Sequence, residues 1–240
     1  EQDITPVLAA AGCYRNRDEA IRSVVPEYEP GWRHKIVLPN VLEGGYRGFS
    51  LVAVAPQGSE LRVRLPLAPY LTIVASTNFK QRTRKMLEYF EADRQNYSVA
   101  GTPNLLEYDQ GFFVKLGDGA ADFKPIAHLY KSQVYQMARE LAVPEAIGLR
   151  PPTTDTYSLP QSQEEFYFSL PYDKMDLCLY ARRHDYSAED AAGALGLTAD
   201  QVGRVYQDIE SKRRAARYLH LPPQVMGRKH RPPRARGREG

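Results

Sequence analysis

The hydrophobic period of the chain changes from that of a helix to that of a strand close to residue 97. Upstream of this point, the i, i+3, i+4, i+7 spacing of an amphipathic helix is followed by Thr83, Met86, Leu87 and Phe90. Downstream, the short apolar run 97–100 leads directly into Gly101-Thr102-Pro103-Asn104. A strand that ends in Gly-Thr is typical of the carboxyl edge of a parallel sheet, where α/β proteins bind ligands. The change therefore predicts an α/β fold with a ligand site near residue 102.

We predict a mostly parallel, Rossmann-like sheet with helices on both faces and a helical C-terminus. Ser187-x-x-Asp190 and Thr198-x-x-Gln201 are capping-box patterns that predict the starts of two late helices. Strand-like segments at 49–54 and 61–65, joined by Pro56-Gln57-Gly58-Ser59, predict a β-hairpin.

Charge is unevenly distributed along the 240 residues, whose formal net charge is +3. The last fourteen residues hold six basic side chains and one acidic one, which leaves 26 basic and 28 acidic side chains in residues 1–226. The Pro- and Gly-rich segment 227–240 is therefore predicted to be a disordered basic tail on one domain, 1–226. Because the domain itself is slightly acidic, nucleic acid is not a predicted partner.

No apolar run has the length of a membrane span, and no signal peptide is visible, so no membrane association is predicted. Two cysteines, Cys13 and Cys178, are too few for a disulfide scaffold or a zinc site. These features favour a cytoplasmic protein.

The densest group of potentially reactive side chains lies between Gly101 and Lys131. Carboxylates such as Glu107 suit Mg²⁺, and lysines such as Lys115 neutralise phosphate charge. Lys131 sits where a helix begins, so its ammonium group and the helix N–H groups could face the same anion. The alternative is a charged surface loop with solvated ion pairs, which is common for this composition.

Three smaller groups are weaker signals. Residues 78–85 place four cations at a predicted helix start, where they oppose the helix dipole and so suggest an anionic ligand or an acidic neighbour. The hydroxyls of Pro152-Thr153-Thr154-Asp155 could bind phosphate or cap a helix. Basic residues at 212–214 complement the end of the last helix, which favours a structural role.

An ordered set of short motifs resembles the NAD⁺ synthase family, whose members are adenylating amide ligases of the N-type ATP pyrophosphatase group. The resemblance runs from about residue 70 to 223, and more weakly back to Glu1. Its motifs are NFKQRTRKM, VAGTPNLLEYDQGFFVKLGD, DFKPIAHLYKSQV, VPEAI, PPTTD, QSQEE and ESKRR.

The resemblance implies a two-step reaction. ATP with Mg²⁺ adenylates the nicotinate carboxylate of deamido-NAD⁺ and releases pyrophosphate, and ammonia then displaces AMP to form the amide of NAD⁺. No glutaminase segment is visible, so the donor is expected to be ammonia, free or supplied by a separate amidotransferase. The family resemblance also implies a homodimer with the dinucleotide site near its interface.

Site residues follow from the matched positions. The resemblance implies that ATP is contacted by Thr102, Lys131 and Thr153. It implies that deamido-NAD⁺ is contacted by Arg82, Lys115, Asp122 and Lys212. Glu107 matches the Mg²⁺ carboxylate, and no residue is assigned a role in covalent catalysis.

The sequence departs from the family pattern in three places. Ser211 stands where many relatives have histidine, and residues 33–67 are longer than the compact pattern, which suggests an insertion. The pyrophosphate loop Ser-Gly-Gly-x-Asp-Ser is absent, and the only adjacent glycines, Gly44 and Gly45, lie in another context. Together with a first residue that is not methionine, this predicts an incomplete chain that lacks N-terminal strands and has little activity alone.

Two alternatives remain from the sequence. One is a catalytically dead paralogue that serves as a dimer partner. The other is a helix-turn-helix nucleic-acid module, because Ala191–Thr198 joins two predicted helices through a glycine and the basic tail could contact phosphates. Two capped helices with a glycine turn are, however, also ordinary packing.

Overall fold

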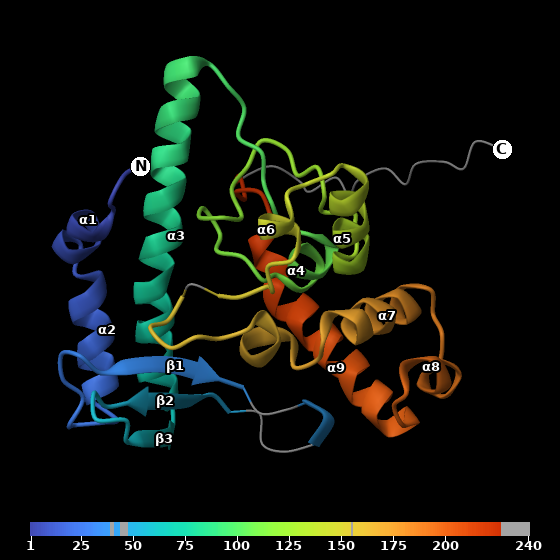
Figure 1. The fold of residues 1–240 in the computed structure, drawn as a ribbon, viewed down its shortest axis with the longest axis horizontal. Helices are drawn as coiled ribbons and strands as arrows, with labels where there is room; N and C mark the ends of the chain where they lie inside the picture. The colour runs from blue at the N-terminus through green and yellow to red at the C-terminus, as the bar shows by residue number, and fades with distance from the viewer. Residues whose placement is uncertain (39–40, 44–47, 155, 227–240) are drawn as a thin grey trace.

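The computed structural model describes residues 1–38, 41–43, 48–154 and 156–226. The described chain is rich in helices and contains one small sheet (Figure 1). Its elements are α1 (Thr5–Ala10), α2 (Cys13–Arg22), β1 (Arg33–Val37), η1 (Val41–Glu43), β2 (Ser50–Val54), β3 (Glu60–Arg64), α3 (Leu67–Gln95), α4 (Leu105–Gln110), α5 (Lys131–Glu140), α6 (Glu145–Gly148), η2 (Glu164–Phe168), α7 (Tyr172–Arg183), α8 (Ala188–Leu195), α9 (Ala199–Ala216) and η3 (Arg217–Leu219).

The predicted hairpin is confirmed and forms most of the sheet. The strand order is β1-β2-β3, and both pairs are antiparallel, with His34 opposite Ala53 and Val52 opposite Arg62. The turn after β2 uses Gly58 at φ +94°, a backbone conformation that glycine adopts without a steric penalty. Leu51 and Ile36 face inward and pack with Ile21 of α2 and Ile73 of α3 in one hydrophobic cluster.

The parallel part of the fold is reduced, among the described residues, to one bridge between Ala100 and Phe123. Asp122 N donates to Val99 O at 2.9 Å, and Gly101 N donates to Phe123 O at 2.7 Å. The described residues therefore do not form the predicted, mostly parallel sheet. The run 97–100 pairs with only one short segment, around Phe123, among these residues. The predicted turn at Gly101 nevertheless lies where expected, directly after this bridge.

Helix α3 is the longest element and corrects one sequence inference. It spans 29 residues, so the cations at 80–85 lie in its middle and not at its start. The helix dipole acts mainly on the first and last turns, so it does not oppose these charges. Figure 1 shows α3 beside α1 and α2, with the sheet at one end and the later helices across from it.

The C-terminal helices form a second hydrophobic cluster. Ser187 caps α8 by accepting from Asp190 N, and Thr198 and Gln201 form the capping box of α9, as predicted. Leu195, Val202 and Val205 of these two helices are buried against α7 and α4. The helix pair thus serves internal packing, and the predicted tail 227–240 lies outside the described residues.

Both cysteines are free and buried. Cys13 Sγ donates to Ser76 O at 3.1 Å, and burial raises the pKa of the Cys178 thiol to about 11. Among the described residues, no helix has the length and hydropathy needed to cross a membrane.

Candidate functional site

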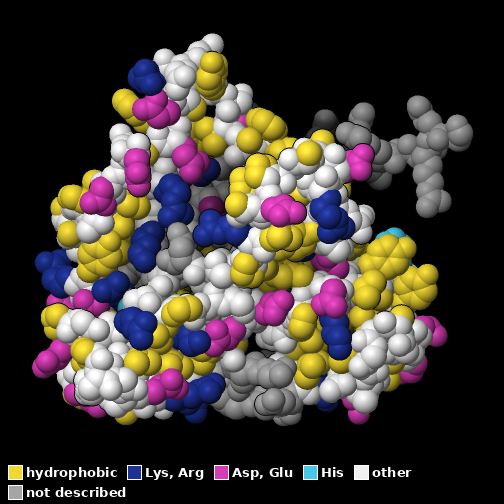
Figure 2. Space-filling model, in the orientation of Figure 1, with side chains coloured by type: hydrophobic (Ala, Val, Ile, Leu, Met, Phe, Trp, Pro, Cys, Tyr) yellow, Lys and Arg dark blue, Asp and Glu magenta, His cyan; other side chains and the backbone are white. Residues whose placement is uncertain are grey.

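A cavity of about 860 Å³ lies where the two hydrophobic clusters meet. Its walls come from the middle of α3, the turn 102–104, the segment 107–118, the segment 153–169 and α9. Figure 2 shows Lys and Arg side chains gathered along the hollow between α3 and the C-terminal helices. Its size and its mixed polar and aromatic walls are those of a small-molecule site.

Seven of the eight residues assigned from the sequence line this one cavity. They are Arg82, Thr102, Glu107, Lys115, Lys131, Thr153 and Lys212. The exception is Asp122, whose Oδ2 accepts from Val99 N at 2.7 Å. Through this hydrogen bond, Asp122 connects the segment after residue 120 to the strand-like run 97–100. The contact has a structural role.

Glu107 is positioned by the start of α4. Asn104 caps the helix through Oδ1, which accepts from Glu107 N at 3.1 Å, and Glu107 Oε2 accepts from Asn104 N at 2.9 Å. This capping box fixes the carboxyl group at the cavity wall. Burial raises the pKa of Glu107, against opposing effects of the Asn104 backbone, Lys131 and Gln163.

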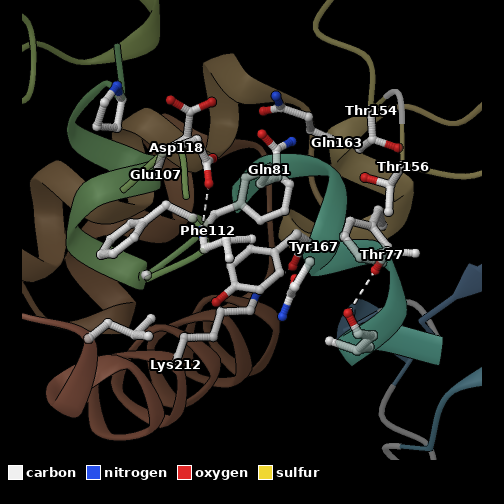
Figure 3. A pocket seen from close by; sticks show the side chains of 18 of the residues that line it. Thr77, Gln81, Glu107, Phe112, Asp118, Thr154, Thr156, Gln163, Tyr167 and Lys212 are labelled. Carbon is white, nitrogen blue, oxygen red and sulfur yellow. Dashed lines mark hydrogen bonds between the residues drawn. The ribbon is translucent and has the colours of Figure 1, made fainter. Parts of the chain in front are cut away.

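A second carboxyl group, Asp118, lies in the same wall, and the sequence assignment did not include it. Its Oδ1 accepts from Val114 N at 2.7 Å, and burial raises the pKa of its carboxyl group. Figure 3 shows Glu107 and Asp118 on one side of the cavity, with Thr154 and Thr156 opposite. The signal was present in the sequence as part of the Gly-, Asp- and Lys-rich run, but only the fold shows which of its acids face inward.

The basic groups are held by backbone carbonyls and aromatic rings. Lys115 Nζ donates to Tyr218 O at 2.8 Å and to Leu221 O at 3.3 Å. Lys212 Nζ donates to Tyr167 O at 2.5 Å, forms an ion pair with Asp208 Oδ2 at 2.6 Å and lies 4.7 Å from the centre of the Tyr167 ring. These contacts fix the ammonium groups at the rim and the floor of the cavity.

Lys131 lies at the first turn of α5, but the first N–H groups of this helix bind an internal carboxylate and not a ligand in the cavity. Ser132 N and Lys131 N donate to the carboxylate of Asp176, at 2.7 and 3.2 Å. Asp176 is buried, so this helix start already has an internal anion, and the expectation that its N–H groups face a ligand is wrong. The Lys131 ammonium itself lies over the rings of Tyr135 and Tyr172 and lines the cavity.

Hydroxyl and amide side chains from the segment after α6 complete the site. Thr153, Thr154 and Thr156 line the cavity together with Gln163, and Thr154 Oγ1 is buried without a partner among the described residues. The sequence signal here was the Thr-Thr pair, which indicated Thr153 but did not separate ligand binding from helix capping.

Carboxylates, lysines and threonine hydroxyls that line one cavity can hold phosphate oxygens and a hard cation together. Such a lining is typical of phosphate-handling α/β enzymes. The chain belongs to the NAD synthase family, whose sequence model matches residues 64–219.

Close relatives support this membership. The NH₃-dependent NAD⁺ synthetase of Rhizobium meliloti is 61% identical over 226 residues, which is 94% of this chain and 68% of the relative. The NH₃-dependent NAD⁺ synthetase of Rhizobium rhizogenes is 62% identical over 226 residues, again 94% of this chain and 68% of the relative. The chain therefore spans about two thirds of the length of these relatives.

A solved structure supports the fold. The NMN synthetase of Francisella tularensis superposes with a TM-score of 0.52 at 25% identity, covering 64% of this chain and 57% of that one. The α/β fold class predicted from the sequence is confirmed by this likeness. The family match also includes α8 and α9, which leaves the helix-turn-helix interpretation without support.

Proposed function

We propose that this chain provides the nucleotide site for ATP-dependent amidation of deamido-NAD⁺ by ammonia. The nicotinate carboxylate attacks the α-phosphorus of ATP and pyrophosphate leaves. Ammonia then attacks the acyl carbon, loses a proton, and AMP leaves with the former bridging oxygen. The observation that carries the proposal is the convergence of seven family-matched residues on one cavity of a chain that belongs to the NAD synthase family.

The cavity residues suit distinct parts of the two substrates. Thr102, Lys131 and Thr153 are proposed to contact ATP, since hydroxyls and ammonium groups bind phosphate oxygens. Arg82, Lys115 and Lys212 are proposed to contact deamido-NAD⁺, whose pyrophosphate and carboxylate are anionic. The Asp122 assignment has less support, because Asp122 does not line the cavity and its Oδ2 accepts from Val99 N.

The carboxyl groups fit a magnesium ion bound together with phosphate. No cluster of three metal-ligating acids, histidines or cysteines occurs among the described residues. Mg²⁺ commonly takes only one or two carboxylates and completes its shell with water and substrate phosphate, which matches Glu107 with Asp118 nearby. When bound, the ion neutralises charge on the phosphoryl oxygens.

Ligand protection tests the proposal directly. Deamido-NAD⁺ at about one hundred times its dissociation constant should stabilise the protein by roughly 2.7 kcal/mol. Lys115→Ala is expected to remove most of this protection, because the variant lacks an ammonium group at the rim of the cavity. The measurement is the ligand-induced shift in Tm, which separates binding from any loss of stability in the variant itself.

Lys174→Ala is the matched control, since Lys174 lies on α7 outside the cavity lining. Its ligand-induced shift should equal that of the unchanged protein. No shift of the unchanged protein with deamido-NAD⁺ or ATP would contradict the proposed function. A normal shift without turnover would instead support the dead-paralogue alternative.

We also propose a homodimer and a cytoplasmic location, with ammonia supplied free or by a separate amidotransferase. An exposed apolar stripe on α3 supports the dimer. Phe79, Met86 and Phe90 follow one helix face and are 37%, 57% and 57% exposed. Exposed apolar stripes of this kind mark protein interfaces.

Replacing Met86 and Phe90 together by glutamate should convert the dimer to a monomer, since two charges would be buried at the interface. Light scattering coupled to gel filtration gives the molar mass. Tyr186→Glu, at an exposed tyrosine beyond α7, is the control and should leave the mass unchanged. A monomeric unchanged protein at micromolar concentration would rule out this dimer.

A further inference from the structure

The small sheet belongs to residues 33–67, nearly all of which precede the region matched by the family. It nevertheless reaches the proposed nucleotide site. Leu38, Val41 and Phe49 line the cavity, and Arg204 of α9 donates to Leu42 O at 2.8 Å. The described part of this insertion therefore forms a wall of the cavity.

Strand β1 lies at the edge of the sheet, and the segment after residue 156 covers its free edge. His34 N donates to Ser158 Oγ at 2.8 Å, and Leu159 N donates to His34 O at 3.1 Å. Gln161 Nε2 donates to Ile36 O at 2.7 Å. Figure 1 shows this segment crossing from α6 to the sheet and returning to α7. Edge groups that would otherwise be open to solvent are thus used to hold a loop.

The side chain of His34 reinforces this attachment. The residue is only 1% exposed, and its Nδ1 lies 2.9 Å from Tyr28 Oη and 3.3 Å from Ser158 Oγ. Burial lowers the pKa of His34 to about 3, with smaller effects of Arg17 and Lys80, so the ring is neutral. A neutral ring can accept at Nδ1 from the Tyr28 hydroxyl, whose own pKa is raised by burial.

The other end of the same loop carries the hydroxyls of the cavity. Thr153 forms a bridge with Ser162, and Thr154 N donates to Gln161 O at 3.0 Å. From the opposite side, Lys80 Nζ of α3 donates to Thr156 O at 3.0 Å. Residues 158–161 are therefore tied to β1 while their partners at 153 and 154 face the cavity.

We propose that Ser158 and His34 are positioning residues for nucleotide binding, because they fix the threonine-bearing loop against β1. Neither residue lines the cavity, so they act through the loop and not by contact with a ligand. The small sheet in residues 33–67 then supports the phosphate site. Nearly all of this sheet lies outside the region that the family model matches. This inference rests on the proposed function.

Ser158→Ala is the first test, since it removes the hydroxyl that accepts from His34 N and contacts His34 Nδ1. Apparent KM for ATP should rise by about five- to tenfold, with kcat and the KM for deamido-NAD⁺ within about twofold. Amide exchange over residues 156–163 should accelerate by about tenfold, because the loop opens more often. Ser158→Thr keeps the hydroxyl and should restore both measurements.

His34→Phe is the second variant and keeps the ring volume while removing Nδ1. It should give the same selective rise in KM for ATP and in loop exchange. Leu195→Ala is the control for lost stability alone, since Leu195 is buried on α8 in the other hydrophobic cluster and does not line the cavity. It should lower Tm yet leave the KM for ATP unchanged.

The outcomes separate the two proposals. Absence of ATP-dependent turnover in the unchanged protein would refute the proposed function and this inference with it. Turnover in the unchanged protein combined with an unaltered KM for ATP in Ser158→Ala would overturn the positioning role only. An equal rise in KM in Leu195→Ala would also overturn it, because general destabilisation would then explain the effect.

Discussion

Glu107→Gln is expected to reduce kcat by about a hundredfold or more while leaving the protein folded. The substitution retains an oxygen that can accept from Asn104 N, so the capping box of α4 survives. It removes the negative charge that is proposed to face Mg²⁺ and the ATP phosphates. Steady-state turnover with saturating ATP, Mg²⁺ and deamido-NAD⁺ is the measurement.

The same variant should be more stable than the unchanged protein at neutral pH. Burial raises the pKa of Glu107 in the folded state, so the folded protein binds this proton more tightly than the unfolded chain. The stabilising effect of protonated Glu107 is present at acidic pH and is lost as the pH rises through the folded pKa of this residue. The glutamine never ionises, and a gain of about 1 kcal/mol at neutral pH is the usual scale when a strained site residue is relieved.

Thermal unfolding of both proteins at acidic and neutral pH tests the direction of this pH dependence. The advantage of Glu107→Gln should grow as the pH rises from the pKa of glutamate in the unfolded chain to the raised pKa of Glu107 in the folded protein, and stay constant above it. Glu140→Gln, an exposed acid at the end of α5, is the matched control and should change neither turnover nor this pH dependence. A variant with normal turnover would remove Glu107 from the proposed metal site.

Gly111→Ala is expected to destabilise the protein by about 2–4 kcal/mol through backbone strain and overpacking together. Gly111 ends α4 at φ +77°, and a Cβ there would lie 2.2 Å from Ala216 Cβ of α9. Relief would require α9 to move, and α9 carries Ser211 and Lys212 in the cavity wall. Urea unfolding gives the loss of stability, and the deamido-NAD⁺ shift in Tm reports the loss of the site.

Gly193→Ala is the matched control at an exposed glycine. Gly193 lies inside α8, and an added Cβ meets nothing within 4 Å. Because alanine favours helix by up to about 1 kcal/mol over glycine, this control should be slightly stabilising. Similar losses in both variants would contradict the packing argument for Gly111.

Local features of the sequence were sufficient to predict several helices and strands. The capping boxes at Ser187 and Thr198 start helices as predicted, because the side chain and the backbone N–H groups that it binds lie within one turn. The hairpin between residues 49 and 65 also follows from local alternation and a turn. In contrast, the sequence analysis placed the cations at 80–85 at a helix start, although they lie in the middle of α3, where no side-chain cap at Pro66 marks the true beginning.

Long-range partners could not be read from spacing. Asp122 contacts Val99 instead of the cavity, and Asp176 occupies the first turn of α5 from 45 residues away. Asp118 faces the cavity although nothing in its local pattern separates it from solvated acids. Each of these outcomes depends on how distant segments pack.

The sequence by itself determined the family and indicated seven of the residues that line the cavity, because these reside in short motifs with fixed spacing. The tertiary structure decided which acids face the cavity, which charges are already neutralised, and how the insertion contributes. Residues 33–38 and 156–165 are far apart in the chain, and their contact at the edge of β1 helps to join the small sheet to the threonine-bearing loop. Burial, and with it the raised pKa of Glu107, likewise arises only when the two hydrophobic clusters enclose the cavity.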